Sequence, residues 1–312
     1  MTNYMEKLPY TGSPEYDKHF WNAMRGNDNS YEHLKKGRNM GTSLYTMPNT
    51  AHKKYMAALG KESLFRNIGT VINAYDSGSR IFAKDSSDLA QWVAENEAIP
   101  IYDGIEDFTI NIIDSKKLAA FVKMDTAFIH DASFDIENYL INRFAKNFAK
   151  AEDNAFINGN GSKMPTGILN ATGGADVGTT ATDATYDKVI ALYFSVKPEY
   201  RKKAVWLMND ETALTLRTLK DDAGNYLWRD SDDTILGKKV IISEFMPSAE
   251  TGNKPIAFGD FSYYWVVGRS PIELRTLSEK FAAVDQLGYL AYEFLDGRLV
   301  RPEAVKVLKI TD

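Results

Sequence analysis

The sequence contains no cysteine among its 312 residues, and this absence excludes several kinds of chemistry. Structural disulfides, thiolate nucleophiles and thiolate metal ligands all require cysteine, and its absence favours a cytosolic origin. Histidine is scarce too: only His19, His33, His52 and His130 are present, and the first three lie in a weakly patterned segment. The sequence therefore offers little material for a histidine metal cluster or a histidine-based catalytic triad.

The chain also lacks an excess of positive charge and any long apolar run. Its 37 basic and 42 acidic residues give a formal net charge of -5, which argues against tight binding to duplex DNA or an anionic membrane. No run approaches the roughly 20 apolar residues of a membrane-spanning helix. The first residues also lack the apolar core of a signal peptide. With 44% hydrophobic residues, the composition is that of an ordinary globular protein, and the length favours two domains.

The most strongly patterned stretch runs from Ser133 to Leu169. Apolar side chains recur there at three- and four-residue steps, at Leu140, Phe144, Phe148, Ala151 and Ala155. This spacing predicts one amphipathic helix over residues 134–157, roughly 36 Å long at about 1.5 Å per residue. Ser133 is the expected N-cap, and a helix of this length usually spans a domain.

A glycine-rich turn follows the predicted helix and contains Gly159, Gly161, Pro165 and Gly167. A phosphate-binding loop has its glycines at the start of a helix, together with a Gly-Lys-Ser/Thr sequence, whereas these glycines end one. We therefore interpret the four residues as a structural turn through which the chain leaves the helix. A β-branched residue at Gly159 or Gly161 is expected to harm folding or assembly.

Residues 1–65 show little periodicity, although short helices are expected over 15–25 and 50–59. Such a segment normally needs another surface to order it, so we expect an arm that contacts a neighbouring subunit rather than a core. A flexible tail is the alternative.

The pattern next predicts a strand over 68–75, a turn and a short strand over 80–82, with a returning strand over 108–112. Because so long an excursion is uncommon within a compact domain, we interpret 68–112 as a projecting hairpin.

A second unit is expected to follow a loop over residues 171–185, which is rich in glycine, threonine and alanine. Its predicted helices cover 185–195 and 210–220, and its predicted strands cover 204–208, 237–243, 256–258 and 263–267. A strand over 117–123 precedes the long helix, and later strands over 288–293 and 298–307 are expected to rejoin the first unit. Strands and helices thus mix in an α+β arrangement.

Candidate catalytic groups have simpler interpretations. His130, Asp131 and Ser133 are neighbours at a helix start, where capping is the expected role. The acidic pairs Asp221–Asp222, Asp232–Asp233 and Glu152–Asp153 are interpreted as solvated surface. Large aromatic residues without interleaved lysine and arginine are interpreted as core or subunit contacts, and these are Trp206, Trp228, Tyr263, Tyr264 and Trp265. The residues therefore favour a self-associating structural protein without a catalytic, cofactor or metal site.

Several motifs follow one another along nearly the whole chain. They are FWNAMRG at 20–26, QWV at 91–93, KLAAFV at 117–122, EDNAFINGNG at 152–161, PTGIL at 165–169, WLMN at 206–209, FGDF at 258–261 and RPEA at 301–304. In this order they resemble the phage major capsid protein family with the Hong Kong 97-type fold, and the segment ending in PTGIL is the most specific.

The resemblance implies a fold with an N-terminal arm (1–66), an extended loop (67–113), a peripheral domain with a long spine helix (114–184), an axial domain (185–268) and a return to the peripheral domain (269–312). It implies a major capsid protein, not an enzyme, that assembles into the icosahedral head shell of a tailed phage or prophage around double-stranded DNA. The implied location is the virion capsid, after assembly in the cytoplasm of a bacterial host.

The partners implied are copies of the chain itself, as pentamers and hexamers, with packaged DNA contacted only non-specifically and no membrane or cofactor. Many family members begin with a long scaffolding segment that a protease later removes, whereas this chain opens a short way before the arm. Either such a segment has already been removed from this chain, or scaffolding is a separate protein. Separate portal or decoration proteins are further possible partners. Two alternatives stay open: an encapsulin-type nanocompartment shell, and, from a different class, a soluble carboxylate-dependent enzyme.

Overall fold

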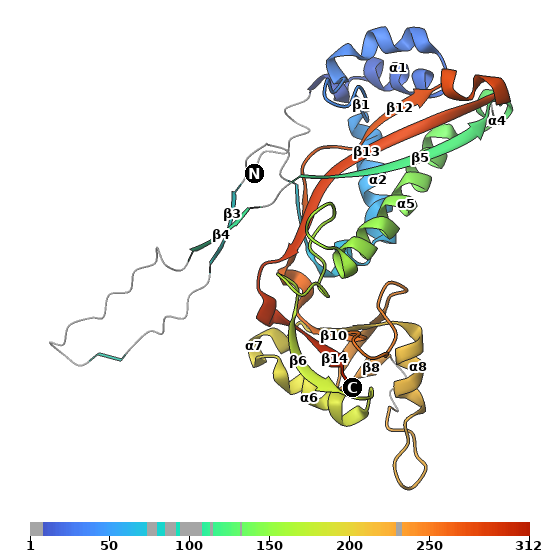
Figure 1. Cartoon of the computed structure of the whole chain (residues 1–312). Helices are drawn as coiled ribbons and strands as arrows, with labels where there is room; N and C mark the ends of the chain where they lie inside the picture. The colour runs from blue at the N-terminus through green and yellow to red at the C-terminus, as the bar shows by residue number, and fades with distance from the viewer. Residues whose placement is uncertain are drawn as a thin grey trace.

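The computed structural model describes residues 9–73, 80–84, 92–93, 108–112, 115–131, 133–228 and 233–312. Two six-stranded sheets, each with its own helices, lie one above the other in an elongated molecule (Figure 1). The upper half in that view holds the long helix α5, and the lower half holds helices α6 and α8 and the C-terminus. The α+β class expected from the sequence is confirmed.

The first sheet is built around one long strand, β13 (Gln286–Leu299). Its order is β1 (Tyr45–Thr46), β12 (Glu273–Leu277), β13, β11 (Tyr264–Gly268) and β2 (Thr70–Asn73), and β5 (Lys116–Asp125) also pairs with β13. The β5–β13 pairing is antiparallel and runs from Gln286 opposite Asp125 to Leu295 opposite Lys116. Because these two strands are long and pair along most of their length, they form the main axis of the upper half (Figure 1).

Helix α5 (Ile136–Asn158) packs beside this sheet and confirms the helix predicted over 134–157. Asp135 caps it, because its side chain accepts a hydrogen bond from the Asn138 backbone N–H at 3.0 Å. The prediction of Ser133 as the cap is therefore wrong, since Ser133 instead donates to the carboxylate of Asp131. The apolar stripe of α5 meets helix α2 (Asn49–Glu62), and together they form the centre of the first core.

The N-terminal segment is part of this core, so the prediction of an arm that stands apart from it is wrong. Its elements are η2 (Pro9–Gly12), α1 (Pro14–Met24), η3 (Asp28–Gly37), α2 and α3 (Phe65–Ile68). Phe20, Met24 and Tyr55 are fully buried within the single chain. Helices α1 and α2 confirm the short helices expected over 15–25 and 50–59. The rest of the segment shows little periodicity because η2 and η3 are 3₁₀ helices, whose side chains repeat every three residues.

The second sheet has the order β6 (Asp176–Ala181), β14 (Val305–Ile310), β10 (Ile256–Gly259), β7 (Val205–Met208), β9 (Lys238–Ile242) and β8 (Thr234–Ile235). Helices α6 (Tyr186–Ser195), α7 (Pro198–Arg201) and α8 (Asp210–Thr218) belong to the same half. Trp206 and Phe258 pack against each other in its core, with ring centroids 4.1 Å apart and planes inclined by 30°. The remaining short elements are α4 (Thr126–His130), η4 (Phe261–Tyr263), η5 (Glu279–Val284) and η6 (Pro302–Ala304).

Two strands lie in a different sheet from the one the sequence suggested, and a third stands where a loop was expected. Strand β6 falls in the expected loop over 171–185, because it pairs in parallel with β14. Strand β14 lies in the second sheet rather than rejoining the first, whereas β11, placed with the second unit, pairs with β13 and β2 in the first. The chain therefore crosses between the two halves more often than the two predicted boundaries, after residues 184 and 268, allow.

The expected hairpin is also built differently. Strand β3 (Arg80–Lys84) pairs with β4 (Phe108–Ile112) as a separate two-stranded sheet, with Arg80 opposite Ile112. The pairing of the two strands that bracket the excursion is thus confirmed, whereas the excursion between them lies outside the described residues except for Trp92 and Val93. The strand before the turn, β2, pairs with β11 in the first sheet instead of with β3. The predicted turn at 76–79 lies outside the described residues. In the part of the chain that the structure covers, no helix has the length and apolar character needed to cross a membrane.

Candidate functional site

The four residues of the predicted turn come together where α5 ends. The Gly159 N–H donates to Ala155 O at 2.8 Å, the Gly161 N–H to Pro165 O at 3.2 Å, and the Gly167 N–H to Gly159 O at 3.0 Å. The turn is thus closed on itself, and it is held to the first sheet because the Thr166 N–H donates to Gly297 O of β13 at 2.9 Å. Their role as a structural turn stays a prediction, although their positions suit it.

Backbone packing leaves no room for side chains at two of these glycines. A Cβ atom on Gly159 would lie 2.1 Å from Pro165 O, and one on Gly167 would lie 2.4 Å from Ile157 O. Gly161 differs, because its φ of 74° is left-handed while its Cβ would meet only the end of the Thr166 side chain, at 2.8 Å. Gly159 and Gly167 are therefore needed because the backbone packs closely against them, whereas Gly161 is needed because its φ is left-handed.

A buried charge network lies one to two turns before this corner. The Arg66 guanidinium donates two hydrogen bonds to Glu152, at 2.7 and 2.8 Å, and a third to Glu293 of β13 at 3.1 Å. The side chains of Arg66, Glu152 and Glu293 are 4%, 0% and 6% exposed. Tyr55 of α2 completes the network, because its hydroxyl donates to the other Glu293 oxygen at 2.8 Å. The network therefore joins α2, α3, α5 and β13.

The neighbouring residue Asp153 fixes the start of α3. Its carboxylate accepts hydrogen bonds from the Leu64 and Phe65 backbone N–H groups, at 2.8 and 3.1 Å, and from the Ser63 hydroxyl at 2.8 Å. Burial raises the pKa of Asp153, while these three hydrogen bonds oppose the rise. The carboxylate thus supplies partners for orphan amides at a helix N-terminus.

The sequence-based interpretation of Glu152 and Asp153 as solvated surface is wrong, because both are buried. The sequence did contain a signal that Glu152 is buried: this residue continues the four-residue spacing of Leu140, Phe144 and Phe148 along the apolar face of α5. A carboxylate on a buried helix face needs a cationic partner, and Arg66 provides it from a segment with no visible periodicity. No sequence signal identified Arg66 or Glu293.

Burial perturbs the titration of this network. Burial raises the pKa of Glu293 to about 7, the charge of Glu152 adds to the rise, and Arg66 opposes it. Nearby His52 shows the opposite shift, because burial, aided by the positive charge of Arg66, lowers its pKa to about 4. Two carboxyl groups thus face one guanidinium, and the protonation of Glu293 changes close to neutral pH.

We expect the replacement Glu293→Gln to change how stability depends on pH. The Glu293 pKa is higher in the folded chain, about 7, than the ordinary 4.5, so its contribution is fully present below pH 4.5 and lost as the pH rises through about 7. His52 acts oppositely: its contribution is present above pH 6.5 and lost as the pH falls through about 4. The variant should therefore gain stability relative to the parent chain between pH 5 and 8, by on the order of 3 kcal/mol.

The measurement is urea unfolding of both chains at several pH values between 5 and 8. The difference between the two free energies of unfolding isolates Glu293, because the His52 contribution is common to both. Glu244→Gln serves as the control, since Glu244 is 65% exposed and pairs with the exposed Lys150. A difference that stays constant across this range would refute the raised pKa of Glu293.

The other candidate groups have structural roles. The Ser133 backbone N–H and hydroxyl both donate to Asp131, as expected for a capping turn. Asp221 accepts from the Ala223 and Asn225 N–H groups in an exposed turn, and Asp232 lies outside the described residues. Trp206, Trp228 and Tyr264 are buried, which confirms core positions for these three aromatic residues.

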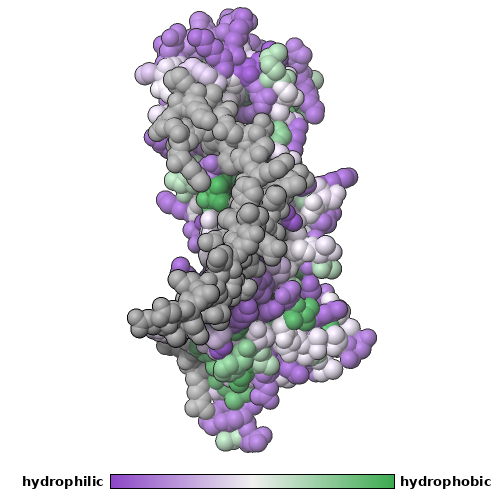
Figure 2. All heavy atoms as spheres, turned by 90° about the vertical axis from the view of Figure 1, so that its left-hand side faces the viewer, coloured by the Kyte–Doolittle hydropathy of each residue, from purple (hydrophilic) through white to green (hydrophobic). Residues whose placement is uncertain are grey.

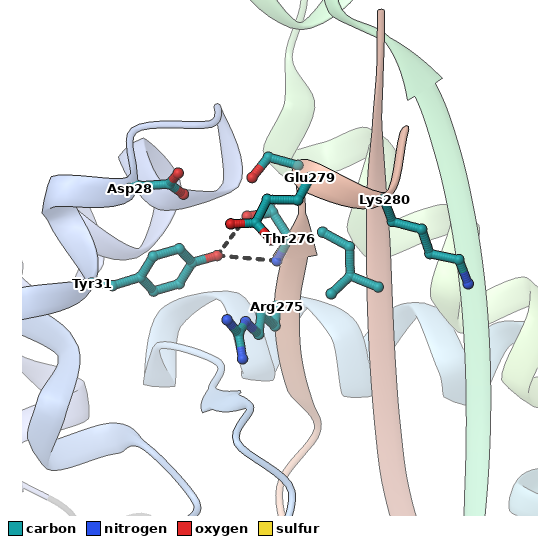
Figure 3. A pocket seen from close by; sticks show the side chains of 8 residues that line it. Asp28, Tyr31, Arg275, Thr276, Glu279 and Lys280 are labelled. Atoms are coloured by element: carbon teal, nitrogen blue, oxygen red, sulfur yellow. Dashed lines mark hydrogen bonds between the residues drawn. The ribbon is translucent and has the colours of Figure 1, made fainter. Parts of the chain in front are cut away.

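A surface pocket of about 370 Å³ lies between η3 and β12 (Figure 3). The Tyr31 hydroxyl oxygen accepts a hydrogen bond from the Thr276 N–H at 3.0 Å and lies 2.6 Å from the Thr276 hydroxyl. Asp28, Glu279, Arg275 and Lys280 line the same pocket, so its charges are of both signs. The Tyr31 contacts join the N-terminal segment to the first sheet.

The fold is shared with known shell proteins. The structure matches the capsid of an empty GTA particle with a TM-score of 0.69 and 30% sequence identity, over 80% of this chain and 90% of that chain. The capsid of a native GTA particle matches with a TM-score of 0.65 and 31% identity over the same shares. A procapsid chain of satellite phage P4, at 9% identity and a TM-score of 0.56 over 83% of this chain and 99% of that one, shares the fold alone. A comparison with curated proteins finds no match.

These likenesses define the class as that of capsid shell subunits. Residues 44–310 match the model of the phage capsid family, and the chain belongs to this family. It is a major capsid shell protein of a phage or a phage-like particle. The family consists of structural proteins, and the resemblance inferred from the sequence motifs is confirmed.

Proposed function

We propose that the chain assembles as pentamers and hexamers into the icosahedral head shell of a tailed phage or prophage, which encloses double-stranded DNA in the virion. The first sheet with α5 is the peripheral domain, and the second sheet is the axial domain that meets its copies at the symmetry centres. The observation that carries this proposal is the family match over residues 44–310 together with 30% identity to a particle capsid. The chain works without catalysis or a cofactor and assembles in the bacterial host cytoplasm.

Exposed apolar side chains support assembly through the second half. Phe194 of α6 and Leu214 of α8 are 65% and 64% exposed in the single chain. Figure 2 shows apolar side chains at the surface of the lower part of the molecule. Large apolar side chains at a surface gain stability when a partner covers them, and a heterologous contact repeated around an axis closes into a ring.

The first test is negative-stain electron microscopy of the purified protein. Angular shells of uniform size are expected, and free monomers under every salt condition would refute the proposal. Nuclease-protected DNA inside particles from the native producer is expected of a head shell. Cargo proteins without DNA would instead establish the encapsulin-type alternative, and saturable turnover by a monomer would establish the enzyme alternative.

Substitutions at Phe194 and Leu214 test whether the second half contacts neighbouring subunits. Phe194→Glu and Leu214→Glu are each expected to abolish shells, because a charge would be buried between subunits without a partner. Both positions are exposed, so the free energy of unfolding of the unassembled chain should change by no more than about 0.5 kcal/mol. Phe194→Leu keeps the surface apolar and should still assemble. Normal shells from both glutamate variants would contradict the proposed axial contact.

A further inference from the structure

Three side chains of metal-ligand type gather on the N-terminal segment. Glu15 and His19 are four residues apart on α1, which places them on one helix face. His33 comes from η3, which packs against α1. One donor atom from each of the three residues lies within 4.8 Å of the others. The fold therefore brings together two of the histidines that the sequence placed in a weakly patterned segment.

The two imidazoles lie face to face, with ring centroids 3.9 Å apart and planes inclined by 12°. The Nδ1 atom of His19 is buried, and within the described chain it has no hydrogen-bond partner. A buried polar atom without a protein partner is uncommon, and a bound ion or water is an ordinary reason for one. On the same helix, Asp17 Oδ1 and Trp21 Nε1 are also buried without a hydrogen-bond partner in the described chain, whereas the Tyr16 hydroxyl donates to Thr46 O at 2.7 Å.

We propose that Glu15, His19 and His33 bind a divalent transition-metal ion, of which Zn²⁺ fits the donor set best. Two imidazole nitrogens and one carboxylate oxygen are zinc ligands, and water completes the tetrahedron. Zinc bonds of about 2.0–2.2 Å would place the donor atoms about 3.3 Å apart. Binding would require both imidazoles to rotate, because the lone pair of an imidazole lies in the ring plane and the two planes are nearly parallel in the present stack. Ca²⁺ and Mg²⁺ are disfavoured, because they prefer oxygen ligands.

A bound ion would tie η3 to α1. Tyr31, also on η3, is hydrogen-bonded to Thr276 of β12, so the same short helix would be fixed at one point to the first sheet and at another to α1. A ligand that binds only the folded chain stabilises it by mass action. The site would therefore strengthen the attachment of the N-terminal segment, and it does not depend on the proposed shell geometry.

The experiment titrates the purified chain, without a histidine tag, with Co²⁺ and with Zn²⁺. Visible absorption of tetrahedral Co²⁺ is expected to saturate at one ion per chain, and Zn²⁺ should displace it. His19→Ala and His33→Ala should each weaken binding at least about tenfold, and Glu15→Gln should weaken it in the same direction. His130→Ala is the matched control, because His130 is an exposed histidine on α4 and its loss should leave the affinity unchanged.

A second measurement distinguishes the loss of metal binding from misfolding of the variants. Chelation with EDTA should lower the melting temperature of the zinc-loaded parent chain and of His130→Ala, but not that of His19→Ala or His33→Ala. Circular dichroism of the four chains should coincide. The proposal is overturned if the parent chain shows no saturable binding, or if the His19→Ala and His33→Ala variants bind Co²⁺ as tightly as the parent.

Discussion

Replacing Arg66 with alanine is expected to lower the free energy of unfolding by about 3–5 kcal/mol, because it leaves two buried carboxyl groups without their cation. Arg66 makes all three of its charged contacts with side chains no more than 6% exposed, so water cannot take its place. Because these contacts join α3 to α5 and β13, the substitution should destabilise the whole first core rather than one loop. Urea unfolding of the unassembled chain measures this effect.

Two further variants separate the charge effect from a general loss of packing. Lys150→Ala removes an ion pair whose partners are 58% and 65% exposed, and it should cost no more than about 1 kcal/mol. The combination Arg66→Met, Glu152→Leu and Glu293→Gln removes the charges together and keeps an acceptor for the Tyr55 hydroxyl. It should recover most of the lost stability, because the penalty of Arg66→Ala lies in the unpaired carboxyl groups. An Arg66→Ala chain as stable as Lys150→Ala would contradict this account.

The parts of the fold that could be predicted are those whose signal is local. Helix α5 follows from a regular apolar spacing over 23 residues and a glycine stop, and its length was predicted to within two residues at each end. Its cap was missed, because Ser133 and Asp135 are both acceptable N-cap residues and only the three-dimensional turn around Asp131 decides between them.

The parts that were missed depend on partners distant in sequence. Strand β6 has the polar sequence DVGTTA and is a strand because β14, about 130 residues later, lies beside it. In the same way, helices α1 and α2 were predicted, but their packing into one core with α5 was not, and Arg66 is identifiable only once α3 is seen against Glu152. Strand assignment reflects packing against neighbours more than intrinsic preference, so such elements cannot be placed from local pattern alone.

Adding a single methyl group at the glycine corner is expected to have the second large effect. Gly159→Ala and Gly167→Ala each place a Cβ within 2.4 Å of a backbone carbonyl oxygen, and a backbone atom in a closed turn cannot rotate away as a side chain can. The end of α5 would have to separate from residues 165–169, which hydrogen-bond back to it. We expect each variant to lose about 3 kcal/mol or more of unfolding free energy, at the upper end of overpacking penalties.

Matched controls distinguish this clash from the intrinsic properties of glycine. Gly60 lies in α2 with open space around its Cβ position, so Gly60→Ala should stabilise the chain by up to about 1 kcal/mol. Gly224 has a φ of 83° and equally open surroundings, so Gly224→Ala should show only the conformational cost of about 1–2 kcal/mol. Gly161→Ala should resemble Gly224→Ala, because its Cβ meets only the Thr166 side chain. If Gly159→Ala also fell in that range, the corner would depend on backbone conformation alone and not on the close approach of α5 to the returning chain.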